Sequence, residues 1–544
     1  MAIRVERGAR RGRTRHGSTR FVGLAGALYL AAGVLATWPA LRGADDAFLG
    51  RGDPSYGETA SGDHLQLGYA LWLVGHQLGR VAAPWRDPYS FQPEAPATLN
   101  LQGWLFGLPY WPVEQAFGAI VAWNTFVLVS YVLAGGAACW WLRTVGLGRG
   151  AALVGGLAFT LAPYRVAQST GHLLGPISVL LPLALVGLER GRDGAVRWLV
   201  LGAAALVAIP LSGQLHLALG AIPFVLAYAL MRQRARAAVV GAGVAAGAAV
   251  LAGVIVQAAV IEDSVADGGR SLDEVAAFSA DWSSLLSRHV GPLEEFVLLG
   301  WATPLLALAG IAALVAQRAR PLATLLGLGV VVPALLALGT NLPLYEPLWR
   351  ALPPLRYPRV PERLLPIACL ALAALAAMAV DQLRGRGIAI AALLLVAVDL
   401  RAGVELYRPA AADERNAAYA ALGRQDSGRL LELPVFIPER QYGSVYLSYA
   451  MQAPRERPGG YSSVAPRAAD RVARELVPLN CGAWSPRLAR RVDQLGVRFV
   501  AVHGGLYADP AVPDCNARAL GALRRHGFRR VAADGLVTFL AAPR

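Results

Sequence analysis

Between about residues 21 and 404, the sequence is divided into apolar blocks of roughly 15–22 residues that contain almost no charge. A run of about 18 or more apolar residues is long enough to cross the hydrocarbon core of a bilayer as a helix. The whole chain of 544 residues is 55% hydrophobic, above the roughly 45–50% of a soluble domain. We therefore expect a mostly α-helical, polytopic transmembrane bundle.

The arginine residues indicate how these helices cross the membrane. The chain contains no lysine, and arginine clusters in six short segments that flank the apolar blocks. Because positively charged loops stay on the cytoplasmic side, we place all six segments inside. Residues 1–20 then form a basic cytoplasmic N-terminus ahead of a transmembrane domain at residues 21–404. The pattern predicts about eleven spans, at residues 21–40, 119–142, 150–163, 173–188, 198–213, 214–231, 237–259, 296–315, 321–340, 364–382 and 388–404.

The apolar stretch at residues 101–117 does not fit this alternation. It contains Pro109 and Pro112, and as a full span it would move the later arginine clusters to the outside. We interpret it as a re-entrant or interfacial segment. Irregular backbone at membrane depth is tolerated where it packs against protein or lines a wet cavity.

Residues 405–544 have a mixed composition without long apolar blocks, and they are numerous enough to form a core of their own. Strand-like and helix-like patterns alternate there, so we expect an α/β domain, which an odd number of spans places outside the cytoplasm. This domain could bind an acceptor or a partner, or it could brace the outer loops. Cys481 and Cys515 are candidates for a disulfide in that compartment. The alternative is two free thiols.

Within the predicted spans, ionisable side chains are rare, and Asp381 and Asp399 lie near span ends. Ion-coupled transporters use charged groups at mid-depth, so this pattern argues against ion-coupled transport and places any chemistry at the outer face. The formal charge of +15 could suggest nucleic-acid binding. Since the arginines cluster beside the spans, as topology requires, we expect no nucleic-acid partner.

The long first outer loop, at residues 42–101, is the richest candidate for a site. Asp63 begins an amphipathic helix, where its carboxylate could be a simple N-cap or a general base or metal ligand held over the membrane. Asp87 precedes Pro88 and could open a turn or supply a second carboxylate.

Other outer segments contain arginine, which runs against the inside bias. Such arginines could snorkel to lipid headgroups, or they could hold a lipid phosphate through bidentate hydrogen bonds. No P-loop, H-E-x-x-H or G-x-S-x-G motif is present. The candidate binding residues of the outer face are His64, Tyr164, Arg165, His172, Arg270, Arg359, Glu362 and Arg363.

Several short motifs occur in an order that is similar to that of a known group of proteins. The chain resembles the GT-C superfamily of membrane glycosyltransferases, and more closely a large bacterial branch of it. The likeness covers nearly the whole chain. The matching residues are Gly62-Asp63 with Trp72; Ala122-Trp123-Asn124; Ala162-Pro163-Tyr164-Arg165 with Gly171-His172; Arg359-Val360-Pro361-Glu362-Arg363; and Gly460-Tyr461-Ser462 with Leu495-Gly496-Val497-Arg498.

The resemblance implies an inverting glycosyltransferase in the bacterial cytoplasmic membrane, which would move a sugar from a polyprenyl-phosphate-type donor to an extracytoplasmic glycan, lipid or protein acceptor. It assigns catalysis to Asp63, which matches the family position well, and to Asp87, a looser match. Arg165, Arg359 and Arg363 would lie at headgroup depth and stabilise the leaving phosphate.

The sequence departs from the family pattern because the first loop lacks a tight D-x-D or E-x-D pair. A bound Mg²⁺ or Mn²⁺ is compatible with the family, but its ligands stay undefined. The alternative function is a non-catalytic membrane transporter or assembly factor for lipid or glycan on the same architecture.

Overall fold

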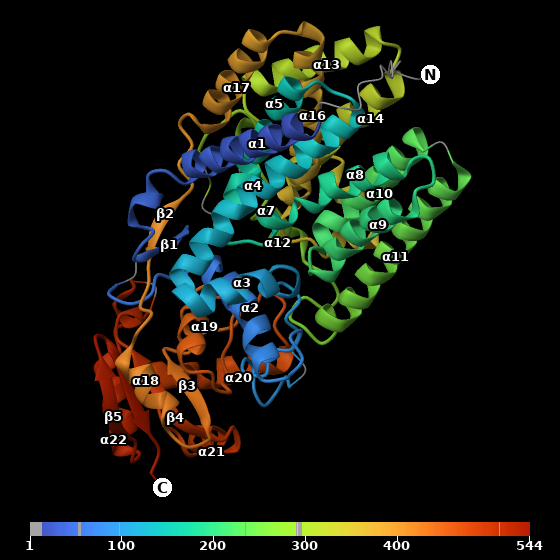
Figure 1. Ribbon diagram of the computed structural model, residues 1–544. Helices are drawn as coiled ribbons and strands as arrows, with labels where there is room; N and C mark the ends of the chain where they lie inside the picture. Colours follow the sequence, from blue (N-terminus) through green and yellow to red (C-terminus); the bar gives the residue numbers. More distant parts are fainter. Residues whose placement is uncertain are drawn as a thin grey trace.

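The computed structural model describes residues 14–52, 56–96, 98–233, 235–289, 291, 296–510 and 512–543, and only the backbone of residues 14–18. Within these ranges the protein is mostly helical with two small sheets (Figure 1). Six helical segments are long and apolar enough to cross a membrane: Thr19–Thr37, Ala119–Val145, Leu174–Gly191, Leu215–Arg232, Arg236–Ile261 and Pro361–Leu383. Shorter apolar helices are Val196–Leu211, Ala302–Ala316 and Arg320–Leu336.

At the centre of the bundle lies α16 (Leu365–Leu383), which is buried along almost its whole length. The neighbouring helix α13 (Ala302–Ala316) approaches α16 closely at Gly310. A side chain at that position would collide with the backbone of Leu375 in α16. Close packing of small residues is the usual basis of helix association in membranes. The helices around this centre are α1 (Thr14–Thr37), α4 (Ala119–Val145), α5 (Arg149–Thr160), α8 (Leu180–Gly191), α14 (Arg320–Leu336) and α17 (Arg386–Arg401).

A second group of helices packs beside this centre. Figure 1 shows α9, α10 and α11 (green) together on one side of the molecule, next to α8. Several large apolar residues of α11 face outward, as expected of a helix in contact with lipid. The bounds are Val196–Leu211 for α9, Leu215–Arg232 for α10 and Arg236–Ile261 for α11.

The stretch with two prolines forms a helix, α3 (Trp104–Phe117), which contains both Pro109 and Pro112. It packs against α2 (Asp63–Gly79) and α4. The helical conformation of this stretch is established. Its re-entrant or interfacial position in the membrane stays a prediction.

In the tail, four strands form a sheet in the order β3-β4-β6-β5. The first pair is parallel and the other two pairs are antiparallel. In Figure 1 this sheet lies at the end of the molecule far from α13 and α14, with α2, α3 and α19 between. The strands are β3 (Arg429–Leu433), β4 (Val497–His503), β5 (Arg529–Asp534) and β6 (Val537–Ala541); the helices are α18 (Ala417–Gly423), α19 (Gly443–Gln452), α20 (Arg467–Leu476), α21 (Pro486–Gln494) and α22 (Asn516–Arg525).

Two contacts attach the tail to the first outer loop. Strand β1 (Ala47–Gly50) pairs antiparallel with β2 (Arg408–Ala411), and α19 packs against α2. Residues 405–544 therefore share an interface with the loop at residues 42–101. This interface holds the candidate site.

Cys481 and Cys515 are joined by a disulfide, and the buried Cys139 and Cys369 are free. The bond closes a loop of 34 residues in the tail. We expect its reduction to lower the free energy of unfolding by about 4 kcal/mol, because loop closure restricts the unfolded chain. The measurement is thermal unfolding of the purified protein with and without a phosphine reductant. The control is the double variant Cys481→Ser/Cys515→Ser, whose midpoint should already be low and should not respond to the reductant. An equal response of both proteins would contradict the prediction.

Candidate functional site

Asp63 occupies the first turn of α2, after Gly62 at the N-cap position. Its carboxylate does not cap the helix. Oδ1 accepts a hydrogen bond from the Tyr461 hydroxyl at 2.6 Å, and Oδ2 lies 3.3 Å from Nε2 of His172. The interpretation of Asp63 as an N-cap is therefore wrong. Its side chain is 22% exposed, so it remains accessible.

Three segments far apart in the sequence converge on this carboxylate. A side chain on Gly171 would come within 2.8 Å of the backbone nitrogen of His64 and within 3.1 Å of Cβ of Asp63. The segment before His172 thus crosses the start of α2 at a distance that only glycine permits. A side chain on Gly460 would similarly collide with the ring of Phe91. The two glycines therefore bring His172 and Tyr461 to Asp63.

His64, beside Asp63, points into the interior instead. It is 2% exposed and lies near the rings of Phe48 and Trp123, with centroid distances of 5.6 and 6.3 Å. Burial lowers its pKa to about 4, so the ring is neutral at pH 7. We remove His64 from the candidate binding residues, because it is a buried core residue.

Arg165 also lies in the interior, within the short helix α6 (Pro163–Gln168), and is 0% exposed. Its guanidinium donates hydrogen bonds to the carbonyl oxygens of Thr160 and Ser130, at 3.2 and 2.8 Å, and lies over the Tyr131 ring. Arg165 is therefore enclosed by protein and is not accessible to a substrate in this structure. Its guanidinium binds one carbonyl within α4 and one at the end of α5.

Tyr164 and Glu362 are fully buried as well, at 0% exposure. The Glu362 carboxylate accepts a hydrogen bond from the backbone N–H of Phe296 at 3.0 Å. Both side chains lie where a substrate has no access in this structure. We therefore remove them from the candidate binding residues.

Asp87 forms a turn, as one of the two sequence interpretations predicts. Its Oδ1 accepts hydrogen bonds from the Tyr69 hydroxyl at 2.8 Å and from the backbone N–H groups of Tyr89 and Ser90 at 2.9 and 3.2 Å. In the part of the chain that the structure describes, Oδ2 accepts none. Asp87 is 7% exposed and lines a cavity.

This cavity, which we name the acidic cavity, has a volume of about 490 Å³. One wall is a face of α2 that includes Gln66 and Tyr69. Asp63 precedes Gln66 by three residues and so lies on the same face of the helix, just beyond the lining. Tyr461 lines the cavity while its hydroxyl bonds to Asp63. The acidic cavity therefore ends beside the Asp63 carboxylate.

An apolar groove of about 470 Å³ runs between α10 and α11. Apolar side chains dominate its walls, and Arg270, Arg359 and Arg363 lie at the end formed by the outer segments. We name it the arginine-ended groove. It meets the acidic cavity, because both are lined by the same four residues, Leu101, Gly213, Val260 and Val464.

The arginines of the groove differ in their partners. Arg270 is 7% exposed and donates to Glu274 at 2.8 Å, to Glu439 at 3.2 Å and to a backbone carbonyl. Arg359 lies over the Phe278 ring, 4.7 Å from its centroid. Burial lowers the pKa of Arg359, and the neighbouring Arg363 and Arg270 lower it further. Arg270 is already paired with two carboxylates, so Arg359 and Arg363 supply the positive charge that would favour an anion in the groove.

A divalent cation does not fit the residues around Asp63. Among the described residues, no group of three or more His, Cys, Asp or Glu side chains is placed so that it could hold a metal ion. Both Asp63 oxygens face protein groups, Tyr461 and His172. Mg²⁺ and Mn²⁺ are usually held by several oxygen ligands. We therefore derive no step through a metal ion.

Tyr461 and Gln66 are site residues that the sequence did not identify. The Gln66 amide donates to the Tyr461 backbone carbonyl at 2.9 Å and so holds the tail segment against α2. The sequence did contain a pointer to Tyr461, because Gly460-Tyr461-Ser462 is one of the motifs that carry the family resemblance. Tyr461 is 398 residues from Asp63, and only the fold makes them neighbours.

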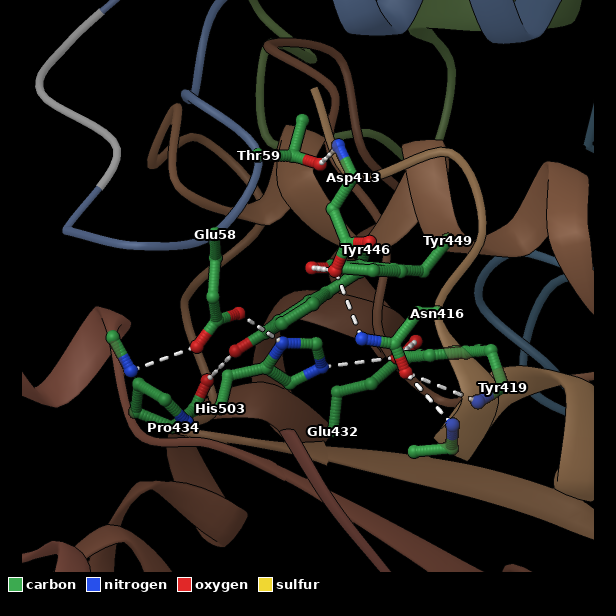
Figure 2. Close-up of polar contacts among 12 residues, drawn as sticks. Glu58, Thr59, Asp413, Asn416, Tyr419, Glu432, Pro434, Tyr446, Tyr449 and His503 are labelled. Atoms are coloured by element: carbon green, nitrogen blue, oxygen red, sulfur yellow. Dashed lines mark hydrogen bonds and ion pairs between the residues drawn. The ribbon is translucent and has the colours of Figure 1, made fainter. Parts of the chain in front are cut away.

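Next to this site, a buried polar network joins the first loop to the tail (Figure 2). His503, at the end of β4, lies between Glu58 and Tyr419, with distances of 2.6 and 2.9 Å from its ring nitrogens. Glu432 forms an ion pair with Arg457, and both are nearly inaccessible. Because these groups are sealed from solvent, we interpret the network as a clamp between loop and tail.

No protein-family model and no curated protein matches the sequence. Solved structures do match it. Arabinofuranosyltransferase AftD from Mycobacteria is 16% identical over 96% of this chain and 40% of that chain, with a TM-score of 0.58. A mutant of AftD is also 16% identical, over 96% of this chain and 42% of the mutant chain, with a TM-score of 0.60. ArnT from Cupriavidus metallidurans bound to undecaprenyl phosphate is 14% identical over 98% and 100%, at a TM-score of 0.41 that is too low to support an argument.

These identities establish a likeness of fold and nothing more. The chain spans about two fifths of the length of AftD. The resemblance that the sequence motifs indicated is confirmed at the level of the fold: this chain has the fold of a GT-C membrane glycosyltransferase.

Proposed function

We propose that the protein is a glycosyltransferase that moves a sugar from a polyprenyl-phosphate-type donor to an extracytoplasmic acceptor. The observation that carries the proposal is that the two cavities meet, and that Tyr461, which lines the acidic cavity, bonds to the Asp63 carboxylate. The arginine-ended groove suits an apolar chain with an anionic head, and the acidic cavity has room for a second substrate. Asp63 lies beside the acidic cavity, where it would face the second substrate.

The proposed topology has eleven spans, a cytoplasmic N-terminus and an extracytoplasmic tail at residues 405–544, in a bacterial cytoplasmic membrane. The positions of the arginine clusters support it. The Cys481–Cys515 disulfide also supports it, since disulfides persist in oxidising compartments. The attachment of the tail to the loop at residues 42–101 requires both to lie on one side of the membrane.

In the proposed reaction Asp63 accepts the proton of an acceptor hydroxyl as that oxygen attacks the anomeric carbon of the donor. The bond between this carbon and the phosphate oxygen breaks, and the polyprenyl phosphate leaves with the electron pair. Arg359 and Arg363 stabilise the charge that develops on the phosphate. Tyr461 and His172 orient the Asp63 carboxylate. Attack from the side opposite the leaving group inverts the anomeric configuration.

The test is sugar transfer by the purified protein in nanodiscs, supplied with a panel of polyprenyl-phosphate sugars and an extract of cell-envelope glycans and lipids as acceptors. We expect transfer from at least one donor, with inverted stereochemistry in the product. Movement of labelled lipid between leaflets without any transfer would instead favour the transporter alternative.

Replacement of Arg359 by glutamine tests the donor groove. We expect the KM for the donor to rise roughly tenfold or more, because a charge-assisted hydrogen bond to phosphate contributes about 1.5–3 kcal/mol. The measurement is the initial transfer rate against donor concentration. Arg350→Gln is the matched control, since Arg350 lies on the exposed part of α15 (Tyr345–Ala351) and pairs with Glu346. Equal donor KM values for both variants would remove Arg359 from the donor site.

A further inference from the structure

The charged residues that line the acidic cavity are all acidic. Within the described residues, its lining contains no arginine or histidine, and its carboxylates are Asp87, Glu94, Glu262 and Asp263. Glu94 is neutralised by an ion pair with Arg491 at 2.9 Å. The remaining three carboxylates give the cavity a negative potential, opposite in sign to that of the arginine-ended groove it adjoins.

Asp87 provides a buried binding group within this cavity. Its Oδ1 is occupied by three hydrogen bonds of the turn, whereas Oδ2 accepts none from the described residues, although the residue is 7% exposed. Oδ2 is not among the enclosed polar atoms of the described residues that lack a partner, so it is open to the cavity. A ligand hydroxyl in the cavity would supply the missing donor.

Other lining groups suit a sugar. Tyr69, Phe91 and Tyr461 contribute aromatic rings, and Gln66 and Asn100 contribute amides. Rings with a few placed polar groups are typical of sites that bind small polar molecules in a fixed orientation. The volume of about 490 Å³ lies within the usual range for such sites.

We propose that the acidic cavity binds the acceptor, and that this acceptor is an uncharged, hydroxyl-rich saccharide. The inference rests on the proposed function and deepens it by naming the acceptor class. Hydroxyl groups donate to Asp87 Oδ2, and the neighbouring carboxylates repel phosphorylated or carboxylated acceptors. The same charge keeps the donor phosphate in the arginine-ended groove, so the two substrates are sorted by charge where the cavities meet.

The first experiment measures binding without transfer. Saturation-transfer NMR is recorded on the protein in nanodiscs with neutral pentose and hexose trisaccharides, each beside a counterpart with a terminal phosphate or uronic acid. We expect signals from at least one neutral trisaccharide and at least tenfold weaker binding of its anionic counterpart. Equal or stronger binding of the anionic forms would overturn the proposal, as would the absence of binding by every neutral form.

The second experiment uses two variants. Asp87→Asn keeps the oxygen that holds the turn and replaces only the cavity-facing one, so we expect at least tenfold weaker saccharide binding with an unchanged melting temperature. Glu262→Arg/Asp263→Arg reverses two exposed charges. We expect the ratio of the affinity for neutral saccharides to that for anionic saccharides to fall towards one. Asp273→Arg, on an exposed position of α12 (Leu272–Ala276) outside the lining, is the control for charge reversal. Unchanged selectivity in the double variant would overturn the proposal.

Donor consumption separates this inference from the proposed function. Release of free polyprenyl phosphate from each donor is measured with and without the saccharides. If no donor is consumed, the glycosyltransferase proposal fails, while the NMR binding data still decide the character of the cavity. If donor is consumed faster with anionic than with neutral saccharides, the acceptor inference fails and the glycosyltransferase proposal stands.

Discussion

Sugar transfer by Asp63→Asn is expected to be roughly 10²–10⁴-fold slower than that of the wild type, because general-base catalysis contributes about that factor. The asparagine has the same shape and can still accept the hydrogen bond from Tyr461, but it cannot take a proton. We therefore expect kcat to fall while the KM for the donor changes little. The measurement is initial transfer rate in nanodiscs, with the thermal unfolding midpoint recorded for the same samples.

Asp45→Asn is the matched control, because Asp45 is an exposed acid of the same outer loop outside both cavities. Tyr461→Phe removes one hydrogen bond that orients Asp63 and should give a smaller loss of kcat than Asp63→Asn. If Asp63→Asn transfers sugar as fast as the wild type, the base lies elsewhere and the assignment is wrong.

The largest loss of stability is expected from Arg457→Met. Arg457 and Glu432 form an ion pair with 0% and 2% side-chain exposure, and removal of one partner leaves the other charge buried. Such a change typically lowers the free energy of unfolding by about 3–5 kcal/mol. The measurement is the thermal unfolding midpoint by tryptophan fluorescence, followed as a function of pH.

The pH dependence has a definite sign. Burial already raises the pKa of Glu432, and Arg457 opposes that effect. Without the arginine the folded-state pKa rises further above the unfolded value, so protonation favours the folded variant and its deficit should shrink as pH falls from 8 to 5. Arg471→Met, at an exposed position of α20, is the control and should have the same unfolding midpoint as the wild type. The double variant Arg457→Met/Glu432→Leu should recover part of the loss. A midpoint for Arg457→Met equal to that of the control would contradict the prediction.

The predicted apolar blocks became helices because their composition leaves the backbone no other partner within a bilayer. The block at residues 237–259 corresponds to α11, and the block at residues 364–382 corresponds to α16. The turn at Asp87 was likewise readable, since an aspartate before a proline accepts hydrogen bonds from the backbone that follows. These features depend on neighbours in the sequence.

The burial and surroundings of individual charged side chains could not be predicted from the local sequence. Arg165 and Arg359 both occur in short segments near prolines, yet one is sealed inside the helical bundle and the other lines a groove. The difference arises from the direction in which each segment turns. Packing of α6 among the core helices sets that direction for Arg165, and nothing in its immediate sequence specifies it.

The sequence by itself determined the membrane character, the apolar helices, the alternation of helix and strand in the tail and the position of Asp63 at a helix start, because periodicity, charge and turn chemistry act over a few residues. Only the tertiary structure decided which groups meet that carboxylate. Tyr461 reaches Asp63 from 398 residues away through the contact of α19 and β2 with the first loop. The acidic cavity and the arginine-ended groove exist only where these segments pack together, so their opposite charges, which would sort the two substrates, are a property of the fold.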